Sequence, residues 1–383
     1  LGVAACGSED PTSPTATTET TGESSESSSS QEAPVTGGLY DETILRTIYL
    51  EFPQADWWSQ LTNNYAAEEN ILADLTVDGV LYPDVGVRFK GDTSYRNTGS
   101  SLKKSFNIEI DDTHADQRVM GYRTLNLNNS YSDPSFIREV LYFNVARQYI
   151  PTARANFVLL VINGESWGVY VNVQQVNRDF IEEWFPSSDG TRWRAEGGGG
   201  APGGMPGGGP GGGPGGGFSG GTSALTWLGS DVAAYEAAYD VRTNDTPEGW
   251  AGLIAACDVL NNTPLDQLES ALVPVLDVES SLWYLAVENA FVDEDGDLQK
   301  GLDYYLYWEI ATGRLHPIQH DGNEATGGAA RLGATSWTPT QGDTDPNRPL
   351  ISRLLAVPSL RESYLSHMRT LASEALDITC LLY

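Results

Sequence analysis

The sequence is short of positive charge. Among its 383 residues, 22 lysines and arginines stand against 52 aspartates and glutamates, which gives a formal net charge of −30. Affinity for nucleic acid depends on cationic side chains that displace counterions from the phosphates, so a chain this acidic is not expected to bind DNA or RNA. The few basic residues therefore have to be considered individually.

Cysteines and long apolar runs are also scarce. Three cysteines are too few for a disulfide scaffold. The sequence contains no run of about 18 apolar residues that could span a membrane. With 40% hydrophobic and 10% aromatic residues the chain can still bury a large core, and its length suggests one large domain or two smaller ones.

The N-terminal segment has little that could pack in a core. Val3-Ala4-Ala5-Cys6 fits a bacterial lipobox in which Cys6 receives a lipid, so residues 1–6 are interpreted as the end of a lipoprotein signal peptide. Residues 7–38 are rich in Ser, Thr and Glu and are predicted to be a disordered linker. We therefore expect an extracytoplasmic bacterial protein, either secreted or lipid-anchored to the cell membrane.

A second low-complexity segment interrupts the rest of the chain. Residues 197–221 contain 17 of the 41 glycines and four prolines, and they are predicted to form a flexible insertion. A phosphate-binding glycine loop is the alternative, but such a loop is shorter and is followed directly by Lys and then Ser or Thr. No lysine follows here, so that alternative is discounted.

Between these segments the residue patterns indicate an α+β fold. Strands are predicted at 85–89 and 105–110, and a helix is predicted to begin at Asp133-Pro134, with Asp as N-cap and Pro in the first position. The other predicted elements are a hairpin of 156–161 and 168–174 turned by Asn163-Gly164, helices at 178–184, 232–239, 250–260, 265–272 and 278–291, a hairpin of 304–310 and 314–319, and a helix at 359–375.

The first of these hairpins contains the string G-x-S-x-G at residues 164–168. In serine hydrolases this string forms a nucleophile elbow, where a strand turns sharply into a helix and exposes the serine hydroxyl. Both flanks here are predicted strands, so Ser166 is interpreted as a turn residue and a serine hydrolase is discounted.

Five basic residues lie within 17 positions, namely Arg88, Lys90, Arg96, Lys103 and Lys104. Glycines and hydroxyl residues lie among them, so charge and backbone N–H groups could together bind phosphates. The alternative is the solvated face of an edge strand. The residues alone leave both possibilities open.

Two acidic segments come late in the chain, D-E-D-G-D at 293–297 and D-G-N-E at 321–324. Oxygen ligands at this density suit Mg²⁺ or Ca²⁺, whereas the alternative is a pair of solvated acidic turns. The first segment is not an EF-hand, because that loop needs Gly at position six and Glu at position twelve, and Leu298 and Tyr304 occupy those places.

The order of the predicted elements is that of a protein kinase. In a kinase a lysine on a strand pairs with a helix glutamate and orients the phosphates, a loop aspartate accepts the proton of the substrate hydroxyl, and a later aspartate holds Mg²⁺. The usual kinase strings H-R-D and D-F-G are absent. A kinase built from this chain would have to be atypical.

At this point the residues resemble the spore-coat protein H family of atypical kinases, known as CotH. The resemblance runs from about Leu45 to Leu376 and rests on several ordered blocks. The blocks are V-R-F-K-G-D-T-S at 87–94, L-K-K-S-F at 102–106, L-N-L-N-N at 125–129, D-P-S-F-I-R-E at 133–139, I-N-G-E-S-W-G-V-Y at 162–170, E-D-G-D at 294–297, D-Y-Y-L-Y at 303–307 and H-D-G-N-E at 320–324.

The resemblance implies a two-lobed fold similar to that of protein kinases for residues 39–383, with the Gly/Pro-rich insertion within it. It implies transfer of the γ-phosphate of ATP to Ser or Thr of a protein, with Mg²⁺, Mn²⁺ or Ca²⁺ as the metal. The expected partners are a nucleotide and a protein substrate with a Ser/Thr-rich segment, and the membrane is contacted only through the N-terminal lipid.

Roles for the nucleotide-binding residues follow from the same resemblance. Lys104, or failing it Lys90, is similar to the phosphate-binding lysine of the family. Arg88 lies two positions before Lys90 and is included with it. Glu139 is the candidate partner on the helix.

The resemblance also implies roles for the acidic residues. Asp321 is similar to the metal-holding aspartate, and Asn323 and Glu324 complete its loop. Asp303 and Asp293 are both candidates for the catalytic aspartate. Some family members have Asp-x-Asp where this chain has Asp321-x-Asn323, so one carboxylate is lost. The alternative function is therefore a non-catalytic surface binding module with structural Ca²⁺ in its acidic loops.

Overall fold

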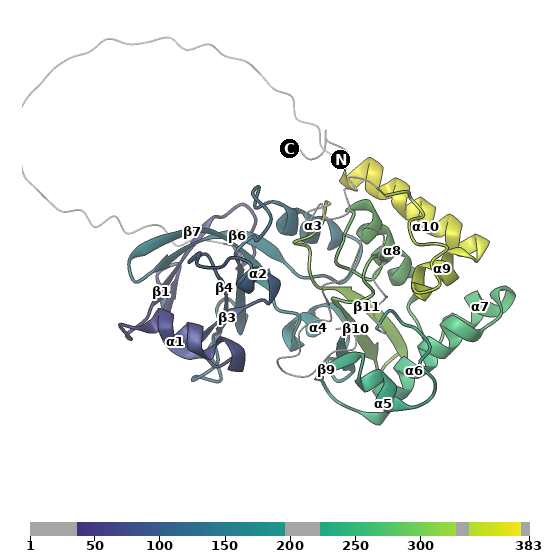
Figure 1. Cartoon of the computed structure of the whole chain (residues 1–383), viewed down its shortest axis with the longest axis horizontal. Coiled ribbons are helices and arrows are strands. Elements are labelled where there is room, and N and C mark those ends of the chain that lie inside the picture. Colours follow the sequence, from purple (N-terminus) through teal and green to yellow (C-terminus); the bar gives the residue numbers. More distant parts are fainter. Residues whose placement is uncertain (1–36, 196–222, 327–336, 377–383) are drawn as a thin grey trace, which may run out of the picture. The chain divides into compact units, whose positions relative to one another are not determined.

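A computed structural model of the chain describes residues 37–195, 223–326 and 337–376 (Figure 1). The predicted lipobox with Cys6, nearly all of the predicted linker, and the predicted insertion at 197–221 lie outside these residues. The described segments belong to one compact unit that begins at Gly37. They contain both sheets and helices, so the predicted α+β class is confirmed.

Seven strands form a closed barrel in the order β1-β2-β3-β4-β5-β7-β6 (Figure 1). The strands are β1 (Arg46–Glu51), β2 (Ile71–Val77), β3 (Val80–Lys90), β4 (Ser105–Glu109), β5 (Thr124–Asn128), β6 (Ala155–Ile162) and β7 (Glu165–Gln174). A parallel contact between β1 and β6 closes the barrel. Along the second half of β3, Val85, Val87 and Phe89 are buried, whereas Arg88 and Lys90 alternate with them and remain partly exposed. The barrel strand thus presents Lys90 on its outer side.

The hairpin of β6 and β7 turns at Asn163-Gly164, as predicted. Both residues have positive φ angles, 48° and 80°, which is the backbone geometry that a two-residue hairpin turn requires. Ser166 lies on strand β7 opposite Val161. The interpretation of Ser166 as a turn residue was therefore wrong, because the strand begins at Glu165. Ser166 is not at a strand-to-helix turn either, so the exclusion of a nucleophile elbow is confirmed.

Helix α3 (Arg138–Ala146) begins later than predicted. Phe136 has a φ of 63°, which lies outside the helical region, so the helix cannot run through it. The prediction that Asp133 is the N-cap and Pro134 the first helical residue was therefore wrong. Instead, the Asp133 carboxylate accepts the backbone N–H of Arg138 at 3.0 Å and ties the preceding turn to the start of the helix.

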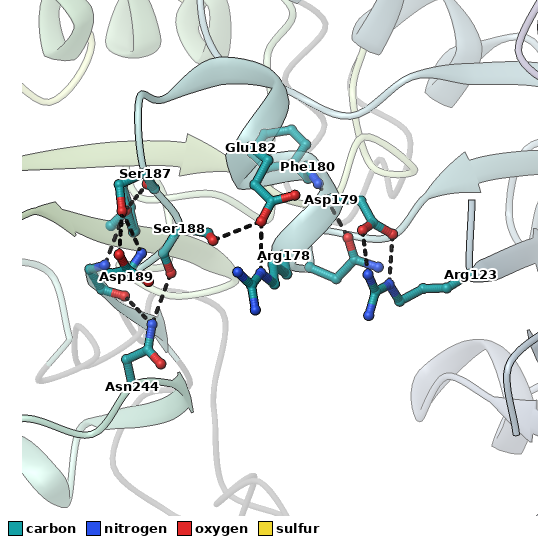
Figure 2. Close-up of polar contacts among 12 residues, drawn as sticks. Arg123, Arg178, Asp179, Phe180, Glu182, Ser187, Ser188, Asp189 and Asn244 are labelled. Carbon is teal, nitrogen blue, oxygen red and sulfur yellow. Dashed lines mark hydrogen bonds and ion pairs between the residues drawn. The ribbon is translucent and has the colours of Figure 1, made fainter. Parts of the chain in front are cut away.

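The chain leaves the barrel through helix α4 (Arg178–Trp184), which begins and ends as predicted. Arg123, the residue before β5, donates two hydrogen bonds to Asp179, from Nε at 2.8 Å and from Nη2 at 2.7 Å (Figure 2). Beyond the helix, the side-chain amide of Asn244 donates to the carbonyl of Ser188 at 2.9 Å. The connecting segment is therefore bound to the barrel at one end and to the second sheet at the other.

The second sheet has four strands in the order β11-β10-β8-β9. They are β8 (Thr191–Ala195), β9 (Tyr239–Thr243), β10 (Tyr304–Glu309) and β11 (Arg314–Gln319). The predicted hairpin of β10 and β11 is confirmed. In the register, Tyr304 lies opposite Ala195 on one side and opposite Gln319 on the other. These three strand ends therefore lie in one row.

Helices surround this sheet and supply most of the larger core. These helical elements are α5 (Val232–Glu236), α6 (Pro247–Asn262), α7 (Leu265–Leu272), α8 (Val278–Ala290), α9 (Pro349–Leu355), α10 (Pro358–Thr370) and the π turn η2 (Leu371–Ala375). Helix α1 (Trp57–Asn64), the 3₁₀ turn η1 (Tyr65–Ala67) and helix α2 (Thr93–Arg96) instead connect strands of the barrel. Trp193 of β8 is fully buried against Trp250 of α6, with 5.4 Å between the ring centroids. No helix of the described residues has the length and apolar character needed to cross a bilayer.

Most of the helices predicted after residue 223 are present, with one correction. A helix was predicted over 232–239, but α5 ends at Glu236 and the chain continues as strand β9 from Tyr239. Tyr239 is buried, and its hydroxyl donates to the carbonyl of Ser223 at 2.8 Å. Pairing with β8 therefore prevails over the local helical pattern.

Candidate active site

Lys90, Glu139 and Asp321 come from three distant parts of the chain and act on one another electrostatically. Lys90 ends β3, Glu139 is in the first turn of α3, and Asp321 follows β11 by two residues. Burial lowers the pKa of Lys90, while the negative charges of Glu139 and Asp321 oppose this effect. Lys90 is thus the lysine that the fold brings to the predicted glutamate and aspartate.

Glu139 is held in place by the barrel. Only 5% of the residue is exposed, and its Oε1 accepts a hydrogen bond from the side-chain amide of Asn128 on β5 at 2.7 Å. Burial, followed by the charge of Asp321, raises the pKa of Glu139 to about 8, and Lys90 acts in the opposite direction. The three residues therefore form one electrostatic unit, in which a bound cation would favour the ionised carboxylates.

Asp321 and Asn323 form a small oxygen-rich loop after β11. The backbone N–H of Asn323 donates to Oδ1 of Asp321 at 3.0 Å, and its side-chain amide donates to Oδ2 at 3.3 Å. Burial, followed by the charge of Asp295, raises the pKa of Asp321. The Oδ1 atom of Asn323 is buried and has no hydrogen-bond partner among the described residues. A buried oxygen in this state can bind a ligand, and an amide oxygen beside a carboxylate suits a divalent cation.

Asp293 connects the two acidic segments. The side-chain amide of Gln319 donates to Oδ2 of Asp293 at 2.7 Å and to the carbonyl oxygen of Asp321 at 3.0 Å. Asp293 is fully buried, and burial, together with the charge of Glu288, raises its pKa well above the usual value. A carboxylate without exposed surface is placed to support the loop rather than to meet a substrate hydroxyl.

Asp295 is the acidic residue that the sequence analysis did not single out. It is partly exposed and forms an ion pair with Lys300. Its charge raises the pKa of Asp293, Asp303 and Asp321. Asp295 therefore interacts electrostatically with all three of these aspartates. Asp295 belongs to the E-D-G-D block at 294–297, and this block was the signal in the sequence that could have identified it.

The turn that carries Asp295 is shaped by Glu288 of α8. The fully buried carboxylate of Glu288 accepts the backbone N–H groups of Asp297 at 3.0 Å and Leu298 at 3.1 Å, and also the hydroxyl of Tyr284 at 2.7 Å. A side chain at Gly296 would clash with this carboxylate. The turn can pass this close to α8 only because residue 296 is glycine.

Asp303 lies immediately before β10 and has a φ of 60°, which is uncommon for a residue other than glycine. Its backbone N–H donates to the carbonyl of Ala195 at 2.7 Å, and its Oδ1 accepts a hydrogen bond from Arg194 at 3.0 Å. Burial, followed by the charge of Asp295, raises the pKa of Asp303 to about 6, and Arg194 acts in the opposite direction. Asp303 is thus near the acidic group, in an ion pair with a residue that the sequence analysis did not consider.

The structure does not bring Lys104, the preferred phosphate-binding lysine, to this group. Its ammonium donates to the carbonyls of Tyr95 at 2.8 Å and Gly99 at 2.9 Å, and to the hydroxyl of Thr98 at 2.7 Å. These bonds use all three of its donors. Lys104 therefore closes the loop after β3, and Lys90 is the lysine beside Glu139 and Asp321.

Arg88 also has a partner within the barrel. It forms an ion pair with Glu109 and donates to the side chain of Asn70 at 3.1 Å. Its charge contributes to lowering the pKa of Lys90, so it lies close to the site without facing the acidic loops directly. Its contact with the nucleotide stays a prediction.

Glu324 completes the acidic group through Lys300, whose ammonium lies 3.5 Å from the Glu324 carboxylate and pairs with Asp295 as well. Within the described residues, no three His, Cys, Asp or Glu side chains are grouped so that they could hold a metal ion by themselves. Magnesium is commonly bound by one or two protein ligands together with substrate phosphates. Asp321 and Asn323 fit that kind of site.

A strand lysine, a helix glutamate and a later aspartate are the parts with which phosphotransferases hold nucleotide phosphates and their metal. The site is therefore typical of a phosphotransferase. Residues 87–380 match the model of the family described as CotH kinase protein, and the chain belongs to that family. The match covers most of the chain and includes every residue of the site described above. No curated protein matches the chain.

Proposed function

We propose that this protein is an atypical kinase that transfers the γ-phosphate of ATP to a serine or threonine of a protein substrate, with a divalent metal. The observation that carries the proposal is the grouping of Lys90, Glu139 and Asp321 in a chain of the CotH kinase family. Lys90 binds the phosphates of ATP, and Glu139 orients its ammonium. A bound nucleotide adds negative charge, which favours the charged form of Lys90.

Asp321 and Asn323 would hold the metal, which is Mg²⁺, Mn²⁺ or Ca²⁺, and Glu324 lies in the same loop. When bound, the metal neutralises charge on the phosphates. The hydrogen bonds from Asn323 to Asp321 keep the carboxylate in place, and the unpartnered Oδ1 of Asn323 supplies a further oxygen. The loss of one carboxylate relative to an Asp-x-Asp sequence is therefore compatible with metal binding.

In the transfer step, the hydroxyl oxygen of the acceptor bonds to the γ-phosphorus and the bond from this phosphorus to the β,γ-bridging oxygen breaks. ADP leaves with the electron pair, and the hydroxyl proton passes to a carboxylate. Two partly exposed carboxylates are candidates for this role, Asp295, which pairs with Lys300, and Asp303, which pairs with Arg194, whereas Asp293 is fully buried. We assign the role to Asp295, because its charge acts on all three of the other aspartates of the group.

We further propose an extracytoplasmic location, with a lipid on Cys6 or release from the cell, on the basis of the lipobox and the acidic Ser/Thr-rich segment at 7–38. The acceptor would be a Ser/Thr-rich segment of another protein. The membrane would be contacted only through the lipid.

The direct test is transfer of labelled γ-phosphate from ATP to a Ser-rich acceptor protein in the presence of Mg²⁺. We expect transfer by the wild-type protein and loss of on the order of a hundredfold or more in Asp321→Ala. Glu362→Ala, on the exposed side of α10, is the control and should retain the wild-type rate. Full transfer by Asp321→Ala would contradict the role of Asp321, and the absence of any transfer by the wild type would contradict the kinase.

One observation favours a second candidate function, a non-catalytic binding module with structural Ca²⁺. Asp297 is fully buried, and neither of its carboxylate oxygens has a hydrogen-bond partner among the described residues. Such a carboxylate needs a proton or a cation. In a thermal-shift measurement, stabilisation by Ca²⁺ but not by Mg²⁺ with ATP would favour the binding module, whereas stabilisation by Mg²⁺ with ATP favours the kinase.

A further inference from the structure

Three side chains of the second sheet lie at the same end of neighbouring strands. Tyr304 pairs with Ala195 of β8 and with Gln319 of β11, so the ends of β8, β10 and β11 are in register. Arg194 comes one residue before the Ala195 end, Asp303 comes directly before Tyr304, and Asp321 follows Gln319 by two residues. The antiparallel arrangement therefore places Arg194 beside Asp303 and near the end of β11, although both are more than 100 positions away in the sequence.

The ion pair of Arg194 and Asp303 is held by the backbone as well as by charge. The guanidinium donates from Nη2 to Oδ1 of Asp303 at 3.0 Å. Asp303 is itself fixed by its N–H bond to the Ala195 carbonyl at 2.7 Å and by its left-handed backbone conformation. Uncommon backbone conformations of this kind persist where the surroundings enforce them, and they are concentrated at functional sites.

Arg194 also shares its surroundings with the predicted nucleotide-binding residues. The strand register places Arg194 near the end of β11, which Asp321 follows by two residues, and the positive charge of Arg194 also acts on Lys90. The side chain of Arg194 is 30% exposed and that of Asp303 is 26% exposed. Both side chains of the pair are therefore partly accessible from the solvent.

We propose that Arg194 is a second cationic contact to the phosphate group that is transferred, and that Asp303 positions its guanidinium. This inference rests on the proposed kinase function and deepens it. An arginine presents several N–H donors in a fixed plane, which fits two phosphate oxygens at once. Lys90 has one ammonium group and can satisfy only part of the charge of a triphosphate. Donors that are fixed before the reaction stabilise the charge that the phosphoryl group carries in the transition state.

The assignment changes the role of Asp303. The carboxylate of Asp303 accepts a hydrogen bond from the guanidinium and holds it in place. Asp303 then acts through Arg194 and is a positioning residue. The proton of the acceptor hydroxyl goes to another carboxylate, which agrees with the proposed role of Asp295.

The test compares the affinities for ATP and ADP, each with Mg²⁺, by isothermal titration calorimetry on the full chain. A contact to the terminal phosphate of ATP is absent with ADP, so Arg194→Lys should weaken ATP binding about tenfold and leave ADP binding close to the wild-type value. Asp303→Asn should move the ratio of the two affinities in the same direction by a smaller factor. A general structural defect would weaken both nucleotides equally.

Arg123→Lys is the matched control. Arg123 also pairs with an aspartate, Asp179, and the two side chains are 33% and 20% exposed, but the pair joins the barrel to α4 (Figure 2). The Arg123→Lys variant should therefore leave the ratio of the ATP and ADP affinities unchanged. An unchanged ratio in Arg194→Lys, or a wild-type protein that binds ATP no more tightly than ADP, would overturn the assignment of Arg194.

The two proposals fail in different ways. If the wild-type protein transfers no labelled phosphate but Arg194→Lys lowers only the ATP affinity, the kinase proposal fails and Arg194 remains a phosphate contact. If the wild type transfers phosphate and the affinity ratio in Arg194→Lys is that of the wild type, the kinase remains and the role of Arg194 is refuted.

Discussion

The basic residues at 88–104 and the acidic residues at 293–324 look like matching halves of one site in the sequence, but the fold uses them differently. On the basic side, most charges are engaged close by. Arg96 pairs with Asp92 at 2.8 Å, Arg88 pairs with Glu109, and Lys103 and Lys104 donate to backbone carbonyls. Lys90 is the member of the group that acts on Glu139 and Asp321.

The acidic residues, in contrast, interact with one another and, within the described part of the chain, are not each paired with a nearby residue of opposite charge. Asp293, Asp303 and Asp321 all have raised pKa values, and the charge of Asp295 contributes to each shift. Holding several carboxylates this close costs free energy unless cations or protons compensate. The comparison teaches that the acidic residues form the site as a group, whereas the basic residues contribute to it singly.

The largest expected effect separates two neighbouring lysines. Lys90→Met should reduce phosphate transfer on the order of a hundredfold or more, because the charge beside Glu139 and Asp321 is removed. Lys104→Met should retain most of the activity and lower the melting temperature, since it removes three hydrogen bonds within the loop after β3. The measurements are labelled-phosphate transfer and thermal unfolding of both variants.

The opposite pattern, with transfer lost in Lys104→Met and kept in Lys90→Met, would show that Lys104 and not Lys90 is the phosphate-binding lysine. Binding of ATP by each variant shows whether a loss of transfer comes from binding or from the chemical step.

How much the sequence could predict follows from the range of the interactions. The hairpin of β6 and β7 was predicted because Asn163-Gly164 is a local turn signal, and α4, a short local element, was predicted with the bounds that it has in the structure. The closed barrel was not predicted, because the parallel contact of β1 with β6 joins segments that are more than 100 residues apart and has no local signal.

The residues of the site were also predicted only in part, because long-range contacts bring them together. Glu139 and Asp321 were predicted from the resemblance, and the structure brings them together. The choice between Lys90 and Lys104 depends on which ammonium group finds hydrogen-bond acceptors within its own loop. The three-dimensional packing of the loop decides this, and the sequence does not show it. Arg194 was missed because only the register of β8 with β10 brings it to Asp303.

A smaller effect is expected on the acidic side from Gly296→Ala. The added methyl group would clash with the Glu288 carboxylate, which cannot move freely because three hydrogen bonds hold it. We expect a loss of about 1–3 kcal/mol in the free energy of unfolding and reduced phosphate transfer, because the turn also carries Asp295. Gly38→Ala is the control, since a side chain there meets no atom within 4 Å. Equal stability of the two variants in urea unfolding would contradict the role of Glu288 in shaping the turn.

The smallest expected effect concerns Lys103 on the basic side. Its ammonium lies 3.6 Å from the centroid of the Tyr170 ring and donates to the carbonyl of Trp167 at 3.1 Å, and burial lowers its pKa to about 8. The folded protein therefore binds fewer protons at this lysine than the unfolded chain does between about pH 8 and the usual lysine pKa near 10.4. Stability of the wild type relative to Lys103→Met should rise with pH across this window, because the cost of burying the charge disappears as the lysine loses its proton. Urea unfolding of both proteins at several pH values from 8 to 10 measures the difference, and a difference that falls with increasing pH would show that the contacts of the ammonium outweigh its burial.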